Sequence, residues 1–396
     1  MTENAREAGG GHLAYYREHG IVPVHYHFIE LQAHLDRRDS LYRSLGLPPA
    51  AFRAVRVLEV APGTGQNSIY VASCLPETLD LVEPNPASLA AIERTYGSLA
   101  LRHTPPRIHG VRLEEFDPAS RFDVVLCENW LGGLPDEIAL IRKLAALVAP
   151  GGVLVLTIVP LSGFFPNLMR KLLSLRAVSP TLDFDTKTRL LVEAFRPHLC
   201  TIANMTRSHR DWVHDCLLNP HYLNVALPLE DALHAVGAEM EALATFPRLG
   251  SDWRWFKALT GADRQFNENL VRAFRRNIHN FLDYRRVWPE RTLEANASLD
   301  GTCQALHKVA VAWHSAFRAA DGGTLKDLSA DIGRLLRALS GEFAEIDDEL
   351  GGAVSELLDL WNAPEVTIPM IAKMRTFRTL FGRETVYLSL TRRTET

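Results

Sequence analysis

The sequence predicts an α/β fold: a Rossmann-like, mostly parallel sheet with helices on both faces, an N-terminal helical lid and a C-terminal helical bundle. Two observations support this class. From Val55 to Val159, apolar runs of strand length alternate with amphipathic stretches of helix length, a pattern typical of βαβ units with parallel strands. Beyond about residue 260, apolar residues instead recur at helical spacing, which indicates packed helices.

The alternating region contains five predicted strands with helices between them. We expect strands at Val55–Val60, Leu79–Glu83, Arg107–Gly110, Phe122–Cys127 and Val153–Val159, and helices at Asn67–Ser73, Ala87–Tyr96 and Asp136–Ala149. Two later runs, Met240–Pro247 and Trp253–Leu259, resemble further strands of the same sheet. They are preceded by a predicted helix at Leu229–Val236 that ends at Gly237, because glycine adopts positive φ without steric cost.

The flanking segments differ from this region. Leu13–Leu47 has approximate helical spacing interrupted by the charged run Asp36–Asp39, and indicates a helical lid or brace on the edge of the sheet. The long stripe from Leu325 to Leu350, with its neighbours, predicts three or four antiparallel helices. We therefore expect a lid at residues 1–50, a sheet domain at 51–260 with a helical cap insertion at about 160–220, and a helical domain at 261–396 ending in an edge strand, Glu384–Thr391.

Composition limits the class of protein. The 396 residues are 47% hydrophobic and 23% charged, with a net charge of -4, so a globular protein without general attraction to nucleic acid is expected. The polar N-terminus lacks a secretory signal, and the uncharged run between Lys143 and Arg170 is broken by prolines and glycines, so no membrane partner is predicted. Five scattered cysteines predict a reducing cytoplasm without a disulfide framework.

The turn after the first strand is the best candidate for a ligand site. Gly63 and Gly65 allow close approach of a ligand to free amide groups at a helix start. Glu59 lies within the first strand, and Glu83 ends the second, where a carboxylate can accept hydrogen bonds from vicinal ribose hydroxyls. The turn lacks the Gly-Lys-Ser/Thr ending of a phosphate cradle, so a nucleoside triphosphate is disfavoured.

Four segments in this order resemble the class I S-adenosylmethionine-dependent methyltransferases. They are Val57–Gly65 (VLEVAPGTG), Leu81–Pro86 (LVEPNP), Phe122–Leu126 (FDVVL) and Leu147–Leu154 (LVAPGGVL). The resemblance covers about residues 50 to 160, and the family usually has glycine where Ala61 stands. It implies S-adenosylmethionine as cofactor. No metal is predicted, because the cysteines are scattered without a Cys-x-x-Cys pair. The implied cofactor-binding residues are Glu59, Ala61, Gly63, Gly65, Asn67, Glu83, Pro84, Asn85, Leu113, Glu114, Glu128, Asn129 and Trp130.

Each implied role has a simpler structural alternative. Glu83 would hold the ribose or cap the following helix, and Leu113 and Glu114 would lie near the adenine unless Glu114 is only a solvated side chain. Glu128, Asn129 and Trp130 follow the fourth strand, where the family often places contacts to substrate or methyl donor, and Trp130 alternatively belongs to the core. These alternatives stay open at the level of sequence.

The candidate catalytic residues come from two clusters. His209, Asp211 and His214 lie within two helical turns, so a histidine and an aspartate can act as base and orienter; the alternative is a surface helix. Tyr16 and Tyr26 belong to an aromatic cluster before the core that either stabilises a sulfonium cation or packs as a brace. A metal site at His214, Cys216 and His221 lacks a defined ligand spacing.

Three functions follow from these features. The first is methyl transfer to a small-molecule acceptor. The second is a methyltransferase-like enzyme that cyclises or cleaves S-adenosylmethionine itself, as azetidine-2-carboxylate synthases do, and releases methylthioadenosine. The third is a non-catalytic cofactor-binding or interaction protein. We rank methyl transfer first because it is the commonest activity of the family, and expect the helical tail to offer a surface for homodimer formation.

Overall fold

The computed structural model describes residues 3–22, 30–249 and 251–394, with side chains from Gly11 onwards. The chain divides into two compact units, each built from separate segments. Unit 1 contains Met1–Val159, Leu227–Phe274 and Thr385–Thr396, and unit 2 contains Pro160–Ala226 and Arg275–Glu384. Each unit is described by itself below.

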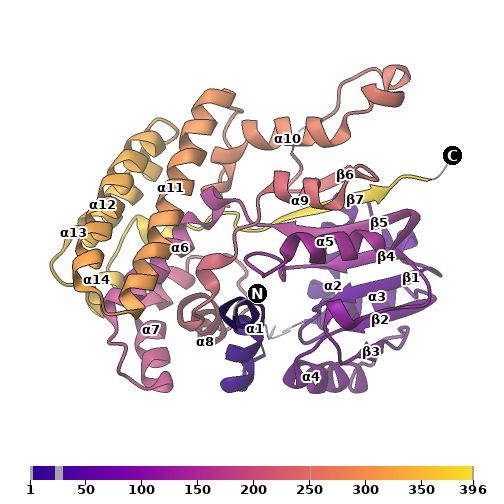
Figure 1. The fold of residues 1–396 in the computed structure, drawn as a ribbon, viewed down its shortest axis with the longest axis horizontal. Helices are drawn as coiled ribbons and strands as arrows, with labels where there is room; N and C mark the ends of the chain where they lie inside the picture. The colour runs from indigo at the N-terminus through magenta and orange to yellow at the C-terminus, as the bar shows by residue number, and fades with distance from the viewer. Residues whose placement is uncertain (1–2, 23–29, 250, 395–396) are drawn as a thin grey trace. The chain divides into compact units, whose positions relative to one another are not determined.

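Unit 1 is built on a seven-stranded sheet with the order β3-β2-β1-β4-β5-β7-β6 (Figure 1). The first five strands pair in parallel, and β7 is antiparallel to both β5 and β6. Since β2 and β4 flank β1 on opposite sides, the order reverses there, at the point where open α/β sheets bind ligands. The strands are β1 Arg56–Val60, β2 Thr78–Val82, β3 Arg107–His109, β4 Phe122–Cys127, β5 Val148–Ile158, β6 Met240–Phe246 and β7 Val386–Arg392.

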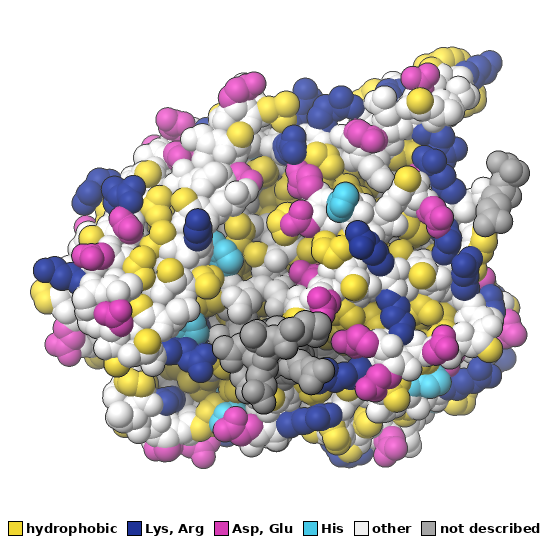
Figure 2. Space-filling view, viewed as in Figure 1, with side chains coloured by type: hydrophobic (Ala, Val, Ile, Leu, Met, Phe, Trp, Pro, Cys, Tyr) yellow, Lys and Arg dark blue, Asp and Glu magenta, His cyan; other side chains and the backbone are white. Residues whose placement is uncertain are grey.

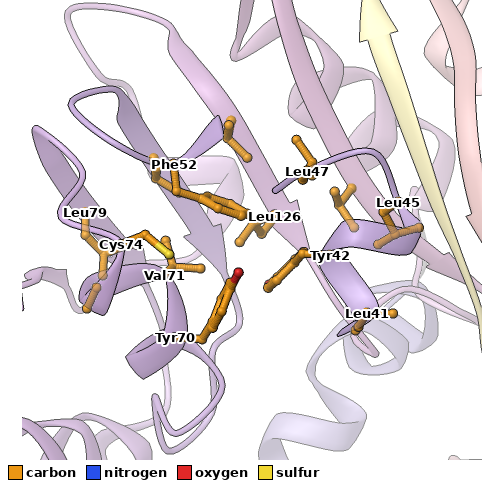
Figure 3. Close-up of a cluster of buried hydrophobic side chains, with 14 of the residues drawn as sticks. Leu41, Tyr42, Leu45, Leu47, Phe52, Tyr70, Val71, Cys74, Leu79 and Leu126 are labelled. Carbon is orange, nitrogen blue, oxygen red and sulfur yellow. The ribbon is translucent and has the colours of Figure 1, made fainter. Parts of the chain in front are cut away.

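Helices of unit 1 cover both faces of this sheet. Apolar side chains of β1, β2, β4 and β5 pack with α2 and α3 on one face, where the rings of Tyr42 and Tyr70 stack at 5.4 Å beside Phe52 (Figure 3). Helices α5 and α9 pack together (Figure 1). The helices are α1 Glu3–Glu18, α2 Leu31–Ser44, α3 Ser68–Ser73, α4 Pro86–Gly97, α5 Glu137–Ala146 and α9 Leu229–Val236.

Unit 2 is helical in its described part. Its three longest C-terminal helices each bury one apolar stripe, as in a bundle. Its first helix is instead buried on all sides from Ser162 to Ser174. The helices are α6 Leu161–Ala177, α7 Phe184–Leu199, α8 His209–Trp212, a π-helix at Val213–Leu218, α11 Leu293–Arg318, α12 Gly322–Ala344, α13 Asp348–Asn362 and α14 Ile368–Ala372. Helix α10, Phe266–Arg276, spans the division between the units.

The structure confirms the predicted α/β class and all five strands between Val55 and Val159, and it corrects several details. Strand β5 begins at Val148, so the preceding helix ends at Ala146 rather than Ala149. Trp253–Leu259 is not a strand: the guanidinium of Arg254 bonds Asp252 and the carbonyl oxygens of Asp263 and Arg264, which closes a loop and leaves Trp253 93% exposed.

Three further expectations change because they depend on tertiary packing. The last strand, β7, pairs on both sides and is not an edge strand. The stripe from Leu325 to Leu350 belongs to two helices, because Asp347 caps a new helix through the amide N–H of Glu349. Helix α2 packs on a face of the sheet and not on its edge.

No helix in the described ranges is long and apolar enough to cross a membrane. All five cysteines are free thiols, and only Cys200 is exposed.

Candidate active site

The loop after β1 turns back on itself through residues with positive φ. Ala61, Gly63 and Gly65 have φ of 56°, 59° and 70°, a region that favours glycine, so Ala61 occupies a position where glycine would be less strained. A Cβ atom on Gly65 would lie 3.1 Å from Ile92, whereas a Cβ atom on Gly63 would meet no atom of the described residues within 4 Å. The contact with Ile92 and the positive φ both disfavour a larger residue at Gly65, and Gly63 borders space that no other described residue fills.

Glu83 joins this loop to the end of β2. Its carboxylate accepts hydrogen bonds from the backbone N–H of Gly63 at 3.2 Å and of Asn85 at 2.8 Å. The side chain of Asn85, not that of Glu83, caps α4 through Ala87 N–H at 3.2 Å. Burial raises the pKa of Glu83 to about 7 although both backbone bonds favour its ionised form. Glu83 is thus a buried carboxylate held beside a glycine that faces open space.

Glu59 lies on β1, the strand that pairs with β2, and is 3% exposed. Burial, and then the charge of Glu128, raise its pKa to about 7. Ser68 is near enough to favour the ionised form of Glu59, but Oε2 accepts no hydrogen bond of normal geometry from the described part of the chain. Buried polar atoms are nearly always hydrogen-bonded, so the unpaired oxygen indicates a place for a bound group.

Arg38 and Tyr42 of α2 meet Glu128 at the end of β4. Arg38 Nη2 donates to both carboxylate oxygens of Glu128, at 2.6 and 2.7 Å, and to the hydroxyl of Tyr42 at 2.6 Å, while that hydroxyl donates to Glu128 at 2.7 Å. Burial opposes the charge of Arg38, but the charges of Glu128, Tyr42 and Tyr387 and the hydrogen bond to Glu128 together outweigh burial and raise the pKa of Arg38 well above its ordinary value. Nε of Arg38 is buried without a hydrogen-bond partner among the described residues.

Two other side chains attach α2 to the loop that follows β1 and to α3. Nε2 of His34 donates to the carbonyl oxygen of Gln66 at 3.0 Å, and burial together with Arg38 lowers the pKa of His34 to about 4. Asp39 accepts a hydrogen bond from the hydroxyl of Tyr70 on α3 at 2.9 Å. Helix α2 is therefore fixed over the carboxyl ends of β1 and β4 by polar contacts as well as by its apolar residues.

Sequence reasoning missed His34, Arg38 and Tyr42 as site residues. These residues are spaced by four, so they lie on one face of a helix, together with the buried Leu41. In the sequence, the charged run Asp36–Asp39 interrupts the helical spacing of apolar residues. A polar side chain repeated on an otherwise buried helix face was the signal that could have identified them.

The remaining predicted cofactor residues have varied environments. Asn129 follows Glu128 with φ of 55°, and its N–H donates to Thr157 Oγ1 at 2.8 Å. Trp130 is half-buried, Leu113 is buried and Glu114 is exposed. Asn67 precedes α3 without a side-chain capping bond. Of the predicted cofactor residues, those at 59–67, those at 83–85 and Glu128 lie at or just after the carboxyl ends of β1, β2 and β4. The cofactor roles of all the predicted residues stay predictions.

Helix α1 lies against this region. Arg17 donates to the carbonyl oxygen of Pro84 at 2.9 Å, next to the predicted ribose contact. Tyr16 is half-buried, with its ring 5.7 Å from that of Tyr15. Tyr26 lies outside the described residues. The N-terminal aromatic residues that are described thus belong to a helix in contact with the loop after β2.

The predicted histidine cluster belongs to unit 2. His209 begins α8 after the cap residue Ser208, whose hydroxyl accepts the N–H of Asp211 at 3.0 Å. His214 is buried, with Nε2 at 3.1 Å from Thr188 Oγ1 and its ring against Phe184. The catalytic roles of His209, Asp211 and His214 stay predictions. Within the described residues, no group of three or more metal-binding side chains occurs.

Residues 31–189 match a family model described as "Methyltransferase domain". This range contains helix α2, strands β1 to β5, and the whole loop and carboxylate cluster.

Solved structures similar to this chain include several methyltransferases. The N-methyltransferase NodS of Bradyrhizobium japonicum WM9, with S-adenosyl-l-homocysteine, is 20% identical over 32% of this chain and 70% of its own, with a TM-score of 0.26. The magnesium protoporphyrin IX methyltransferase ChlM of Synechocystis PCC 6803 is 16% identical over 40% of this chain and 74% of its own, with a TM-score of 0.30. The amino pentose methyltransferase CalS10 of Micromonospora echinaspora is 27% identical over 36% of this chain and 54% of its own, with a TM-score of 0.25. No curated protein matches the chain.

Proposed function

We propose that residues 31–189, which match the methyltransferase family model, form a class I S-adenosylmethionine-dependent methyltransferase domain, and that this enzyme methylates a small-molecule acceptor by in-line displacement. The observation that carries the proposal is the arrangement at the ends of β1 and β2. There the buried carboxylate of Glu83 accepts the N–H of Gly63, and Gly63 borders open space.

The residues at these strand ends fit S-adenosylmethionine. A buried carboxylate at the end of the second strand suits two ribose hydroxyls, and Glu83 is held in place by two backbone N–H groups. Oε2 of Glu59 and Nδ2 of Asn85 have no hydrogen-bond partner among the residues that the structure describes, and they offer an acceptor and a donor to the polar methionine part. We assign the ribose to Glu83, the methionine part to Glu59 and the Gly63 loop, and the adenine to the Leu113–Glu114 region.

S-adenosylmethionine supplies, when bound, an electrophilic methyl group on a sulfonium ion. The protein then has to hold the acceptor in line with that group and exclude water. Helix α2 contributes to water exclusion because its buried face covers the strand ends. The carboxylates of Glu59 and Glu83 give the site an acidic character that suits a cationic ligand.

A small-molecule acceptor is favoured over a nucleic acid by charge. The chain has a net charge of -4, and the face visible in Figure 2 has Lys and Arg side chains interspersed with Asp and Glu. A nucleic-acid-binding surface would instead concentrate positive charge. We keep Tyr16, Tyr26, His209, Asp211 and His214 as candidates for the groups that orient or deprotonate the acceptor.

The proposal extends to the setting of the enzyme. Five free thiols suit the reducing cytoplasm, where we place the protein. We also propose that the helical tail supports a homodimer, which light scattering of the purified protein would detect as twice the mass of one chain.

The first test follows the nucleoside product of S-adenosylmethionine by mass spectrometry, with and without a panel of hydroxyl, amine and carboxylate acceptors. We expect S-adenosylhomocysteine to appear only with an acceptor. Methylthioadenosine formed without any acceptor would replace methyl transfer by cyclisation or cleavage of the cofactor. Binding of the cofactor with no product across the panel would favour the non-catalytic alternative.

Glu83→Ala tests the site itself. Removal of a charged acceptor that bonds the ribose is expected to weaken S-adenosylmethionine binding by about tenfold or more, measured by calorimetry. Glu93→Ala is the matched control, because Glu93 is an exposed residue of α4 and its loss should leave the affinity unchanged. Equal affinities of the two variants would contradict the assignment of Glu83.

A further inference from the structure

We infer that Arg38 is a positioning residue of the active site: it holds helix α2 closed over the strand ends by neutralising Glu128 beside Glu59. This inference rests on the proposed function, since it concerns how the cofactor site is assembled. Arg38 lies outside the loop and the carboxylates on which the resemblance to methyltransferases rests.

The contacts of Arg38 span elements that are distant in sequence. Arg38 and Glu128 are 90 residues apart, and their side chains are 8% and 4% exposed. Tyr42 completes the network through bonds to both partners. A buried charge that loses its partner is strongly disfavoured, so Glu128 and α2 are each held in position by the other.

Arg38 also sets the electrostatic environment of Glu59. The groups that act on Glu59 or respond to it are Arg38 and Tyr42 from α2, Cys127 and Glu128 from the end of β4, Ser68 from α3 and Tyr96 from α4. Among these, Arg38 carries the positive charge that lowers the pKa of Glu59, and Glu128 carries the like charge that raises it. Without Arg38, two buried carboxylates would face one another, and one of them would take up a proton.

The proton on Glu59 matters because only the ionised carboxylate attracts a cation. Binding of S-adenosylmethionine through Glu59 is therefore expected to strengthen as pH rises and to level off above the pKa of Glu59. Removal of Arg38 moves that pKa up, and removal of the charge of Glu128 moves it down. A residue that only supported the fold would weaken binding equally at every pH.

The test measures the dissociation constant of S-adenosylmethionine by calorimetry between about pH 6 and pH 9, with kcat and KM beside it where turnover is found. For Arg38→Met we expect the midpoint of the pH dependence to rise by about one pH unit. For Glu128→Gln we expect this midpoint to fall. For Arg38→Lys, which keeps the positive charge, we expect the midpoint to return toward that of the unaltered protein. Arg37→Met is the matched control, because Arg37 is the exposed neighbour on the same helix.

The outcomes separate this inference from the proposed function. An unaltered protein that binds no S-adenosylmethionine at any pH would overturn the proposed function. Normal binding with an Arg38→Met profile that matches Arg37→Met, or with shifts of the same sign in Arg38→Met and Glu128→Gln, would overturn the role of Arg38 alone. If Arg38→Met does not fold, the shifts of Glu128→Gln and Arg38→Lys decide the question.

Discussion

At the scale of single residues, the site contains buried carboxylates whose burial lowers the stability of the folded protein. Glu59 and Glu83 are 3% and 6% exposed, and burial raises the pKa of each to about 7. A carboxyl group with a raised pKa holds its proton in the folded state at a pH where the unfolded chain has lost it. Without a ligand, such groups destabilise the fold, which is common at functional sites.

The sign of the pH dependence follows for Glu59. Its pKa rises from 4.5 to about 7 on folding, so its contribution to stability falls as pH rises between these values and is constant above them. The penalty at pH 8 is at most about 3 kcal/mol. Glu59→Gln should therefore raise the melting temperature more at pH 8 than at pH 5, and should weaken binding of S-adenosylmethionine.

Differential scanning fluorimetry at the two pH values, without cofactor, measures this effect. An equal change in melting temperature at both would show that Glu59 titrates normally in the folded protein.

At the scale of elements, helix α2 is the part that the βαβ pattern does not account for. Its apolar residues pack against the sheet, and Tyr42 lies 5.0 Å from Phe52 and 5.4 Å from Tyr70, ring centroid to ring centroid. Its polar face meets the loop after β1 and the end of β4. The helix thus belongs both to the core and to the candidate site.

Phe52→Ala tests the apolar attachment of α2. Phe52 is 0% exposed, and loss of a buried phenylalanine side chain destabilises a fold by about 3–5 kcal/mol through lost burial and a cavity. We expect a melting temperature several degrees lower, measured by calorimetry. Phe256→Ala removes the same side chain where it is 67% exposed, and should change little; comparable losses in the two variants would contradict the packing.

At the scale of the whole molecule, the sheet of unit 1 depends on the C-terminal segment. Strand β7 pairs with β5 on one side and with β6 on the other, so it belongs to the interior of the sheet. The segments of unit 2 interrupt the chain of unit 1 between β5 and α9 and between β6 and β7. The sheet is therefore complete only when residues on both sides of these segments are present.

A chain shortened after Glu384 lacks β7 and tests this dependence. Loss of β7 leaves the backbone N–H and C=O groups of β5 and β6 that pair with it without partners. We therefore expect aggregation or loss of the cooperative melting transition, as measured by circular dichroism. A chain shortened by Glu395 and Thr396 alone should melt normally. A soluble, cooperatively folded protein without β7 would show that β5 and β6 do not need it.

The sequence by itself determined the α/β class, the first five strands, and the loop and acidic residues at the strand ends. These features are local: a strand, a glycine turn and a strand-terminal acid are each encoded within about ten residues, and parallel strands bring their carboxyl ends to one edge. The methyltransferase resemblance rested on the same local segments.

Only the tertiary structure decided which distant side chains meet. The bond between Arg38 and Glu128 joins residues 90 positions apart, and the place of β7 between β5 and β6 depends on pairing across inserted helices. Periodicity shows which face of an element is buried but not what covers it. Charged residues in a helical run are usually solvated, so a buried arginine becomes evident only when its carboxylate partner is located in space.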